Sequence, residues 1–340
     1  MKNQSKIRKI ANLTIQLLIL CATFGFIYKQ VVYKNDVAAI LKNFEGEFSK
    51  PGFVKGMILM VLLMIINWGI EAWKWEFLIG KIEKVSFIKA FQAVLSGVSI
   101  SSFTPNRIGE FFARVFILEK ASHIEGILIT VLGSMSQLLI TILAGSLSLL
   151  VFIPNYLSDT VFSHGYLYYS LVAIVLSFDV LILGLFFNVS FLSSLKEKIL
   201  KNGLKKLRKF FRIFSFYHNK EIGKVILLSF LRYGVFSFQF FLLLRLFGVA
   251  IPFFQAQVLI SLLFFIMAVV PTIALTEIGI RGSVAIYIFG LYFSRVNPSH
   301  PGCTLCIFAA STLLWLINVG VPALIGSLFL FRLQFFRNRK

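Results

Sequence analysis

Long runs of apolar residues alternate with short polar stretches along almost the whole chain. A membrane-spanning helix needs about 20 mostly apolar residues, and eight runs come close to or exceed this length. They cover residues 11–33, 53–79, 86–104, 124–153, 166–189, 222–247, 253–271 and 303–331. The pattern predicts an all-α, polytopic membrane protein, with residues 1–340 forming a single integral membrane domain.

Two of the runs are broken by a proline that is followed by glycine and by side chains of opposite charge. The breaks read Ser102-Phe103-Thr104-Pro105-Asn106-Arg107-Ile108-Gly109-Glu110 and Val270-Pro271-Thr272-Ile273-Ala274-Leu275-Thr276-Glu277-Ile278-Gly279-Ile280-Arg281. Shorter helical stretches follow them, over 105–119 and 276–293. The apolar part of the first stretch, 111–118, is too short to cross a bilayer of ~30 Å at 1.5 Å per residue.

We therefore expect two broken, re-entrant hairpins, over residues 86–119 and 253–293, in addition to about six full spans. Eight or more full spans is the alternative. The first half of the chain, 1–193, holds an N-terminal helix, one hairpin between two helices, and the helix 166–189. The second half, 221–340, repeats the order of helix, broken hairpin and helix.

The distribution of Lys and Arg predicts how the two halves are oriented. The segment 194–220 carries nine basic residues and one acidic residue, whereas the loop 153–165 carries no Lys or Arg. Basic loops lie on the cytoplasmic side, so we expect 194–220 and both basic termini to be cytoplasmic. The halves then have opposite orientation, an inverted repeat common in transporters. The segment 194–220 is also amphipathic, which favours binding to anionic headgroups over a solvated linker.

The composition supports a membrane protein and argues against nucleic-acid binding. Hydrophobic residues make up 58% of the chain and charged residues 14%, compared with about 25% charged in soluble domains. The net charge of +20 arises mainly in short loops. Cys303 and Cys306 form a C-x-x-C, which we interpret as small helix residues because no second ligand pair accompanies them. We therefore expect no metal site and no cofactor.

The charged residues at the two breaks form a candidate anion site. Thr104 is a suitable N-cap for a helix that starts at Pro105, and Thr276 for one that starts at Glu277. Helix N-termini bind phosphate through free N–H groups, and arginines add planar donor forks. We therefore expect a lipid phosphate to bind at these breaks, with the carboxylates neutralising the arginines when no lipid is bound. Structural ion pairs that tie the hairpin tips together are the alternative. The candidate residues are Thr104, Arg107, Gly109, Glu110, Arg114, Glu277, Gly279 and Arg281.

Other charges lie within the apolar runs, where ionisable residues are costly and usually functional. Asp179 and Arg232 are each central in a predicted span, so we expect a buried pair or a proton-linked switch. Glu71 and Lys74 lie near one end of the run 53–79, beside tryptophans. We interpret them as a structural anchor at the membrane interface.

The residues at the breaks also resemble those of a known family. The run from Thr104 to Arg114 resembles a signature of the flippase-like membrane domain of lysylphosphatidylglycerol synthases. The run from Glu277 to Arg281 is similar to the second, glycine-rich signature of that family. Glu277 stands where the common pattern has Gly, and Gly282 stands where it has Glu. The resemblance is to a stand-alone member without the synthase domain, so it does not imply lipid aminoacylation. We expect that the protein is not an enzyme.

The resemblance and the two charged breaks together predict a flippase-like transporter. It would move an anionic phospholipid or a polyprenyl-linked lipid between the leaflets of a bacterial-type cytoplasmic membrane, with membrane lipids as its partners. Two alternatives stay open: a non-transporting partner of a lipid or envelope synthesis enzyme, and an intramembrane enzyme that modifies lipids. A homo-oligomer and a complex with a lipid-synthesis enzyme are both compatible with this interpretation.

Overall fold

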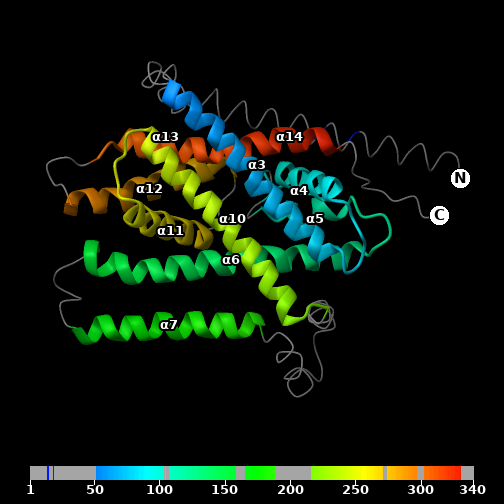
Figure 1. Ribbon diagram of the computed structural model, residues 1–340, viewed down its shortest axis with the longest axis horizontal. Coiled ribbons are helices and arrows are strands. Elements are labelled where there is room, and N and C mark those ends of the chain that lie inside the picture. Colours follow the sequence, from blue (N-terminus) through cyan, green and yellow to red (C-terminus); the bar gives the residue numbers. More distant parts are fainter. Residues whose placement is uncertain are drawn as a thin grey trace, which may run out of the picture.

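The computed structural model describes residues 51–102, 104, 107–157, 165–187, 216–270, 274–296 and 302–330, together with Thr14 and Leu18. These parts of the chain are helical and contain no β-strand (Figure 1). The predicted first span, 11–33, lies outside the described residues apart from those two positions. The basic segment 194–220 does so apart from its last five residues.

The helices follow the predicted apolar runs closely. They are α3 (Pro51–Ile79), α4 (Phe87–Ser101), α5 (Gly109–Val115), α6 (His123–Phe152), α7 (Gly165–Phe187), α10 (Asn219–Leu246), α11 (Phe253–Val269), α12 (Ala274–Val296), α13 (Thr304–Trp315) and α14 (Val321–Phe329). A π-helical turn, Ile153–Leu157, extends α6, and a second, Leu316–Gly320, joins α13 to α14. The apolar runs of the sequence therefore located the helices of the described chain to within a few residues.

Five helices of the described chain are long and apolar enough to cross a membrane. They cover Pro51–Ile79, His123–Tyr156, Gly165–Phe187, Asn219–Leu246 and Thr304–Phe329. In four of them most of the apolar window is not buried, as expected for helices whose apolar side chains contact lipid tails; the buried share is 22% in Pro51–Ile79. Thr304–Phe329 differs, because 61% of its window is buried inside the bundle. The chain is thus an all-α, polytopic membrane protein, as its sequence predicts.

The two broken segments form helical hairpins of unequal shape. In the first, α4 has 15 residues and α5 has seven, and the two helices pack against each other. At 1.5 Å per residue neither reaches ~30 Å. In the second, α11 has 17 residues and α12 has 23, so α12 is long enough to span. Re-entry of the hairpins into a membrane stays a prediction.

Each half of the chain packs a long helix against the hairpin of the other half. Helix α6 lies along α11, α14 lies along α4, and α3 lies beside α10 (Figure 1). This exchange is what two related halves would produce. Their inverted orientation across a membrane stays a prediction.

Glycines permit the closest of these helix contacts. A Cβ on Gly145 of α6 would overlap the ring of Phe265 on α11, and a Cβ on Gly326 of α14 would overlap the carbonyl oxygen of Leu95 on α4. The hydroxyl of Ser99 also donates to a carbonyl oxygen of α14. Small residues at helix crossings are typical of membrane proteins, because they let backbones approach without a hydrophobic driving force.

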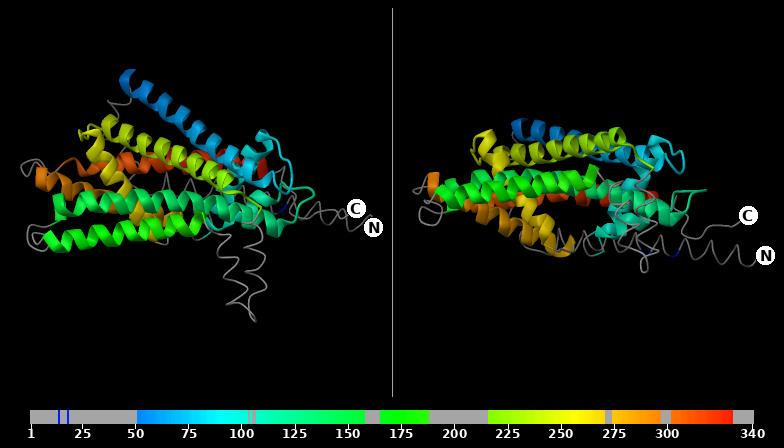
Figure 2. Two further views of the ribbon diagram at one scale, coloured as in Figure 1. Left: turned by 60° about the horizontal axis from the view of Figure 1, so that its bottom comes forward. Right: turned by 90° about the horizontal axis from the view of Figure 1, so that it is seen from below.

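Helix α7 lies at the edge of the bundle, along α6 (Figures 1 and 2). Only Asp179 and Phe186 are buried among its residues. The core of the protein is therefore formed by α3–α6 and α10–α14.

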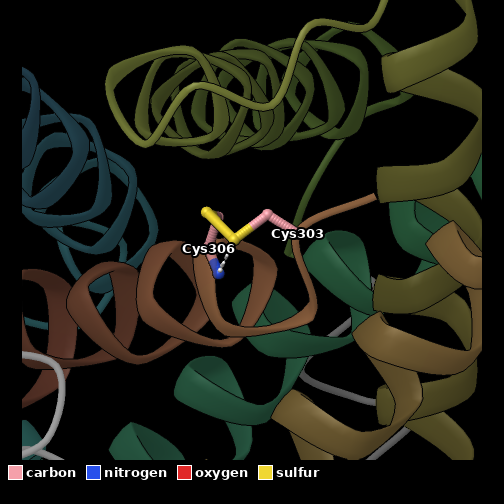
Figure 3. Close-up of a disulfide and its surroundings, with 2 residues drawn as sticks. All are labelled: Cys303 and Cys306. Carbon is pink, nitrogen blue, oxygen red and sulfur yellow. Dashed lines mark hydrogen bonds between the residues drawn. A yellow bond between two sulfur atoms is a disulfide. The ribbon is translucent and has the colours of Figure 1, made fainter. Parts of the chain in front are cut away.

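Cys303 and Cys306 form a disulfide at the start of α13 (Figure 3). The Cys303 sulfur also accepts a hydrogen bond of 3.1 Å from the Cys306 N–H, which caps the first turn of the helix. The interpretation of these cysteines as simple small helix residues was wrong: Cys303 is the N-cap of α13, and its Cα lies 5.1 Å from that of Cys306 in the first turn.

Candidate functional site

A network of buried ion pairs centres on the carboxylate of Glu71 in α3. Lys74, one turn further along α3, lies 2.8 Å from one carboxylate oxygen. Arg114 of α5 donates to the other carboxylate oxygen at 2.8 Å. Arg232 of α10 lies 3.2 Å from the oxygen that Lys74 contacts. Arg114 also pairs with Glu110, four residues earlier in α5. We call these five residues the Glu71 cluster; it joins three helices that are distant in sequence.

The Glu71 cluster is deeply buried. The side chains of Glu71, Lys74 and Arg114 are between 1% and 4% exposed. Lys74 is also within 3.4 Å of the Ser229 hydroxyl on α10. Because isolated charges are costly in a low-dielectric interior, the cluster is stable only while its acidic and basic members remain together.

A second network, the Glu277 cluster, links the two hairpins. Arg107, in the break between α4 and α5, donates to both carboxylate oxygens of Glu277 in α12, at 2.8 and 2.9 Å. Arg281, one turn further along α12, donates to the same carboxylate at 2.5 Å. Glu110–Arg114 in α5 and Glu277–Arg281 in α12 therefore have the same i, i+4 spacing in the two hairpins.

The backbone of Arg107 is in the left-handed region, with φ of 57°. This conformation costs a residue with a Cβ about 1 kcal/mol or more. It turns Arg107 out of the line of α5, which begins only at Gly109. The side chain then reaches across to the second hairpin rather than continuing the face of Glu110 and Arg114.

Both clusters border one cavity of about 560 Å³. Arg107, Arg232, Arg281 and Glu277 line its charged side. Further lining residues come from every long core helix: Asn67 and Trp68 of α3, Gln137 and Thr141 of α6, Tyr233 and Phe236 of α10, Phe264 and Met267–Val269 of α11, and Asn318 and Val319 of the π-helical turn.

Arg232 is held where the charged and aromatic sides of the cavity meet. Its guanidinium carbon lies 5.0 Å from the centre of the Trp68 ring, a cation–π contact. The lining also has an apolar wall, in which the Phe236 and Phe264 rings stack with their centres 5.0 Å apart. The wall continues to Val269, which is 69% exposed at the tip of α11. The cavity therefore combines arginine donors with an apolar surface that reaches the outside of the bundle.

The predicted helix caps are only partly correct. The N-cap of α5 is Ile108 rather than Thr104, although the Thr104 hydroxyl oxygen does accept from the N–H of Gly109, the first residue of that helix, at 2.8 Å. Helix α5 thus begins at Gly109 and not at Pro105. Helix α12 begins at Ala274, so Thr276 lies inside it rather than before it. Real helix ends depend on tertiary contacts such as the Arg107–Glu277 pair, which the local pattern does not contain.

The structure places five of the eight predicted site residues in the two clusters. Arg107, Glu277 and Arg281 meet at the cavity. Glu110 and Arg114 instead belong to the Glu71 cluster. Gly109 is the first residue of their helix, α5, and Thr104 precedes that helix. Gly279 is exposed, with open space around its Cα.

The predicted pair of Asp179 and Arg232 was wrong. Both carboxylate oxygens of Asp179 lie 2.9 Å from the hydroxyl of Ser146 on α6. Arg232 pairs with Glu71 and lies 3.5 Å from the Gln137 amide oxygen. Helix α7 packs along α6 at the edge of the bundle, whereas α10 packs mainly against α3, α6 and α13, so the two charges do not meet.

The interpretation of Glu71 and Lys74 as an interfacial anchor was also wrong, since both are buried in the core. A signal for this was available in the sequence. Asn67, Glu71 and Lys74 are spaced at i, i+4 and i+7, which places them on one face of α3. That face points inward: the Asn67 amide donates to Asn318 at 3.2 Å. Asn318 lies in a π-helical turn, a feature frequent at functional sites.

Among the described residues no group of three or more His, Cys, Asp or Glu side chains is arranged to hold a metal ion. Comparison with known proteins gave one finding: a family model described as the lysylphosphatidylglycerol synthase TM region matches residues 10–320. That match includes both hairpins and both charged clusters. No curated protein and no solved structure matches the chain.

Proposed function

The chain belongs to the family of the lysylphosphatidylglycerol synthase TM region, and from this premise we propose that it is a flippase-like transporter of lipids. It moves an anionic phospholipid or a polyprenyl-linked lipid between the leaflets of a bacterial-type cytoplasmic membrane. Both termini and the basic segment 194–220 face the cytoplasm, in accord with the positive-inside pattern.

The observation that carries this proposal is the cavity between the two hairpins. Arg107, Arg232 and Arg281 reach it from three different elements, and arginine forks suit the oxygens of a phosphate group. The apolar wall formed by Phe264 and Val269 suits the hydrocarbon next to that phosphate. A lipid has this same combination of a charged headgroup and an apolar chain.

The Glu277 carboxylate supports a role in gating. It holds Arg107 and Arg281 together, and so ties the first hairpin to the second. A phosphate that enters the cavity competes with Glu277 for the same guanidinium donors. Binding of the headgroup then loosens the tie between the hairpins, which is the coupling of ligand and conformation that alternating access requires.

The test is lipid translocation by the purified protein in vesicles, with a melting curve for each variant. Arg107→Gln and Arg281→Gln are each expected to abolish translocation while the protein remains folded. Lys at either position is expected to restore it only in part, since Lys lacks the bidentate fork. Arg245→Gln is the matched control, because Arg245 is an exposed arginine in the last turn of α10.

Two outcomes would count against transport. Full translocation by a stable Arg107→Gln, Arg281→Gln double variant would exclude this site. A protein that moves no lipid by itself, but binds a lipid-synthesis enzyme, would instead be a non-transporting partner. Chemical change of the lipid headgroup by the purified protein would favour the third possibility, an intramembrane enzyme.

A further inference from the structure

The charged side chains of the two clusters do not balance. In the Glu71 cluster, Lys74, Arg114 and Arg232 face two carboxylates, those of Glu71 and Glu110. In the Glu277 cluster, two arginines share a single carboxylate. Each cluster therefore carries one positive charge in excess, counted over the ion pairs of the described residues.

The excess charge lies at the cavity. Arg114 is paired with both Glu71 and Glu110 and is 2% exposed, whereas Arg232 lines the cavity. Arg107 and Arg281 line it as well. Arginine does not lose its proton in proteins, and an unbalanced charge inside a membrane is costly. The cavity thus requires anionic charge, one negative charge for each cluster.

The same side chains have donors that are still available. The Arg281 side chain is 9% exposed, and its Nε and Nη1 atoms are buried without a hydrogen-bond partner in the described chain. The same holds for Nε of Arg232 and for the indole Nε1 of Trp68. All three residues line the cavity. Buried donors normally find an acceptor, and these unpaired donors belong to cavity-lining residues of three helices, α3, α10 and α12.

We propose that the cavity takes a lipid headgroup with two negative charges, a phosphomonoester or a diphosphate, in preference to a phosphodiester with one. This deepens the proposed function and rests on the same site. The two charges would balance the one positive charge left in each cluster, and the phosphate oxygens would accept from Arg281, Arg232 and Trp68. The hydrocarbon chain would lie along Phe264 and Val269 toward the outside of the bundle.

The experiment compares two lipids with the same acyl chains. Dioleoyl phosphatidic acid is a phosphomonoester, and dioleoyl phosphatidylglycerol is a phosphodiester. Binding of each to the purified full chain in detergent is measured by isothermal titration calorimetry. At pH 7.5 we expect the phosphatidic acid to bind at least about tenfold more tightly, because its second charge adds charge-assisted hydrogen bonds.

The preference for phosphatidic acid over phosphatidylglycerol should decrease as the pH falls. A phosphomonoester has a second pKa of about 6, so it carries nearly two charges at pH 7.5 and about one at pH 5. The tenfold preference is therefore expected to disappear at pH 5. The titratable or charged side chains that line the cavity are Arg107, Arg232, Tyr233, Glu277 and Arg281. Phosphatidylglycerol keeps a constant charge over this range, so it reports any change that comes from the protein itself.

Two further measurements show which part of the ligand and which residue of the protein account for the binding. Inorganic pyrophosphate should bind far more weakly than phosphatidic acid, because it lacks the hydrocarbon; equal affinity would show a site for free phosphates and overturn the lipid assignment. Arg281→Gln should reduce the preference for phosphatidic acid, while Arg245→Gln should preserve it. The comparison of the two lipids on the unmodified protein needs no variant to fold.

Equal affinity for the two lipids at both pH values would overturn the inference. The result is separable from the proposed function, since binding in detergent does not require translocation. A clear preference without lipid movement in vesicles would support the headgroup assignment and refute transport. Rapid movement of phosphatidylglycerol in vesicles, with equal binding of the two lipids, would support transport and refute the headgroup assignment.

Discussion

Replacing Glu71 with Gln tests whether the Glu71 cluster holds the core of the protein together. The substitution keeps the shape of the side chain but removes the one carboxylate that Lys74, Arg114 and Arg232 share, at distances of 2.8, 2.8 and 3.2 Å. Glu110 would remain as the only acidic member. The excess positive charge of the cluster would rise from one to two.

The expected cost follows from burial. Removing one partner of a buried ion pair typically costs about 3–5 kcal/mol, and Glu71 is 4% exposed on its side chain with three cations around it. We therefore expect a loss near the upper end of that range. The control is Glu119→Gln, whose ion pair with Lys89 is exposed, with side chains 62% and 53% accessible. Surface pairs contribute about 0–1 kcal/mol.

The assay is thermal unfolding of the purified variants in detergent. We expect Glu71→Gln to lower the midpoint by about 10 °C, because a loss of about 5 kcal/mol corresponds to this shift at roughly 2 °C per kcal/mol for a large domain. Glu119→Gln should leave it nearly unchanged. Adding Lys74→Gln returns the cluster to its original net charge, so the double variant should recover part of the loss. If Glu71→Gln and Glu119→Gln have the same unfolding midpoint, the ion pairs of the Glu71 cluster do not stabilise the core.

Three other outcomes are expected. Gly326→Ala should lower the melting temperature markedly, because a Cβ there would overlap the Leu95 carbonyl oxygen and push two helices apart; an unchanged midpoint would contradict that contact. Asp179→Asn and Arg232→Gln should destabilise additively, since the two side chains have different partners; a strong coupling energy would restore the pair proposed from sequence. In a Cys21→Ser background, which removes the third cysteine of the chain, thiol-specific labelling should leave the Cys303–Cys306 disulfide unmodified until a reductant is added; labelling of that variant without reductant would show free thiols.

Much of the architecture could be predicted because it depends on local patterns. About 20 consecutive apolar residues indicate a membrane span, and proline and glycine indicate a helix break. The same local reasoning placed Arg107, Glu277 and Arg281 at the breaks, and these three residues do meet at the cavity. It also placed Glu71 and Lys74 at a helix end, where their position suggested an anchor, although the face they share with Asn67 is buried.

The sequence by itself determined the fold class, the positions of the helices and their two breaks, the family, and the presence of costly charges within apolar runs. Only the tertiary structure decided which charges are partners: Arg107 with Glu277, Arg232 with Glu71, and Asp179 with Ser146. The physical reason is that hydropathy and spacing place a charge on a helix and on one of its faces. These partners lie between 33 and 170 residues apart in the chain. Which residues meet depends on how helices cross and rotate, and that is set by packing contacts such as those of Gly145 and Gly326.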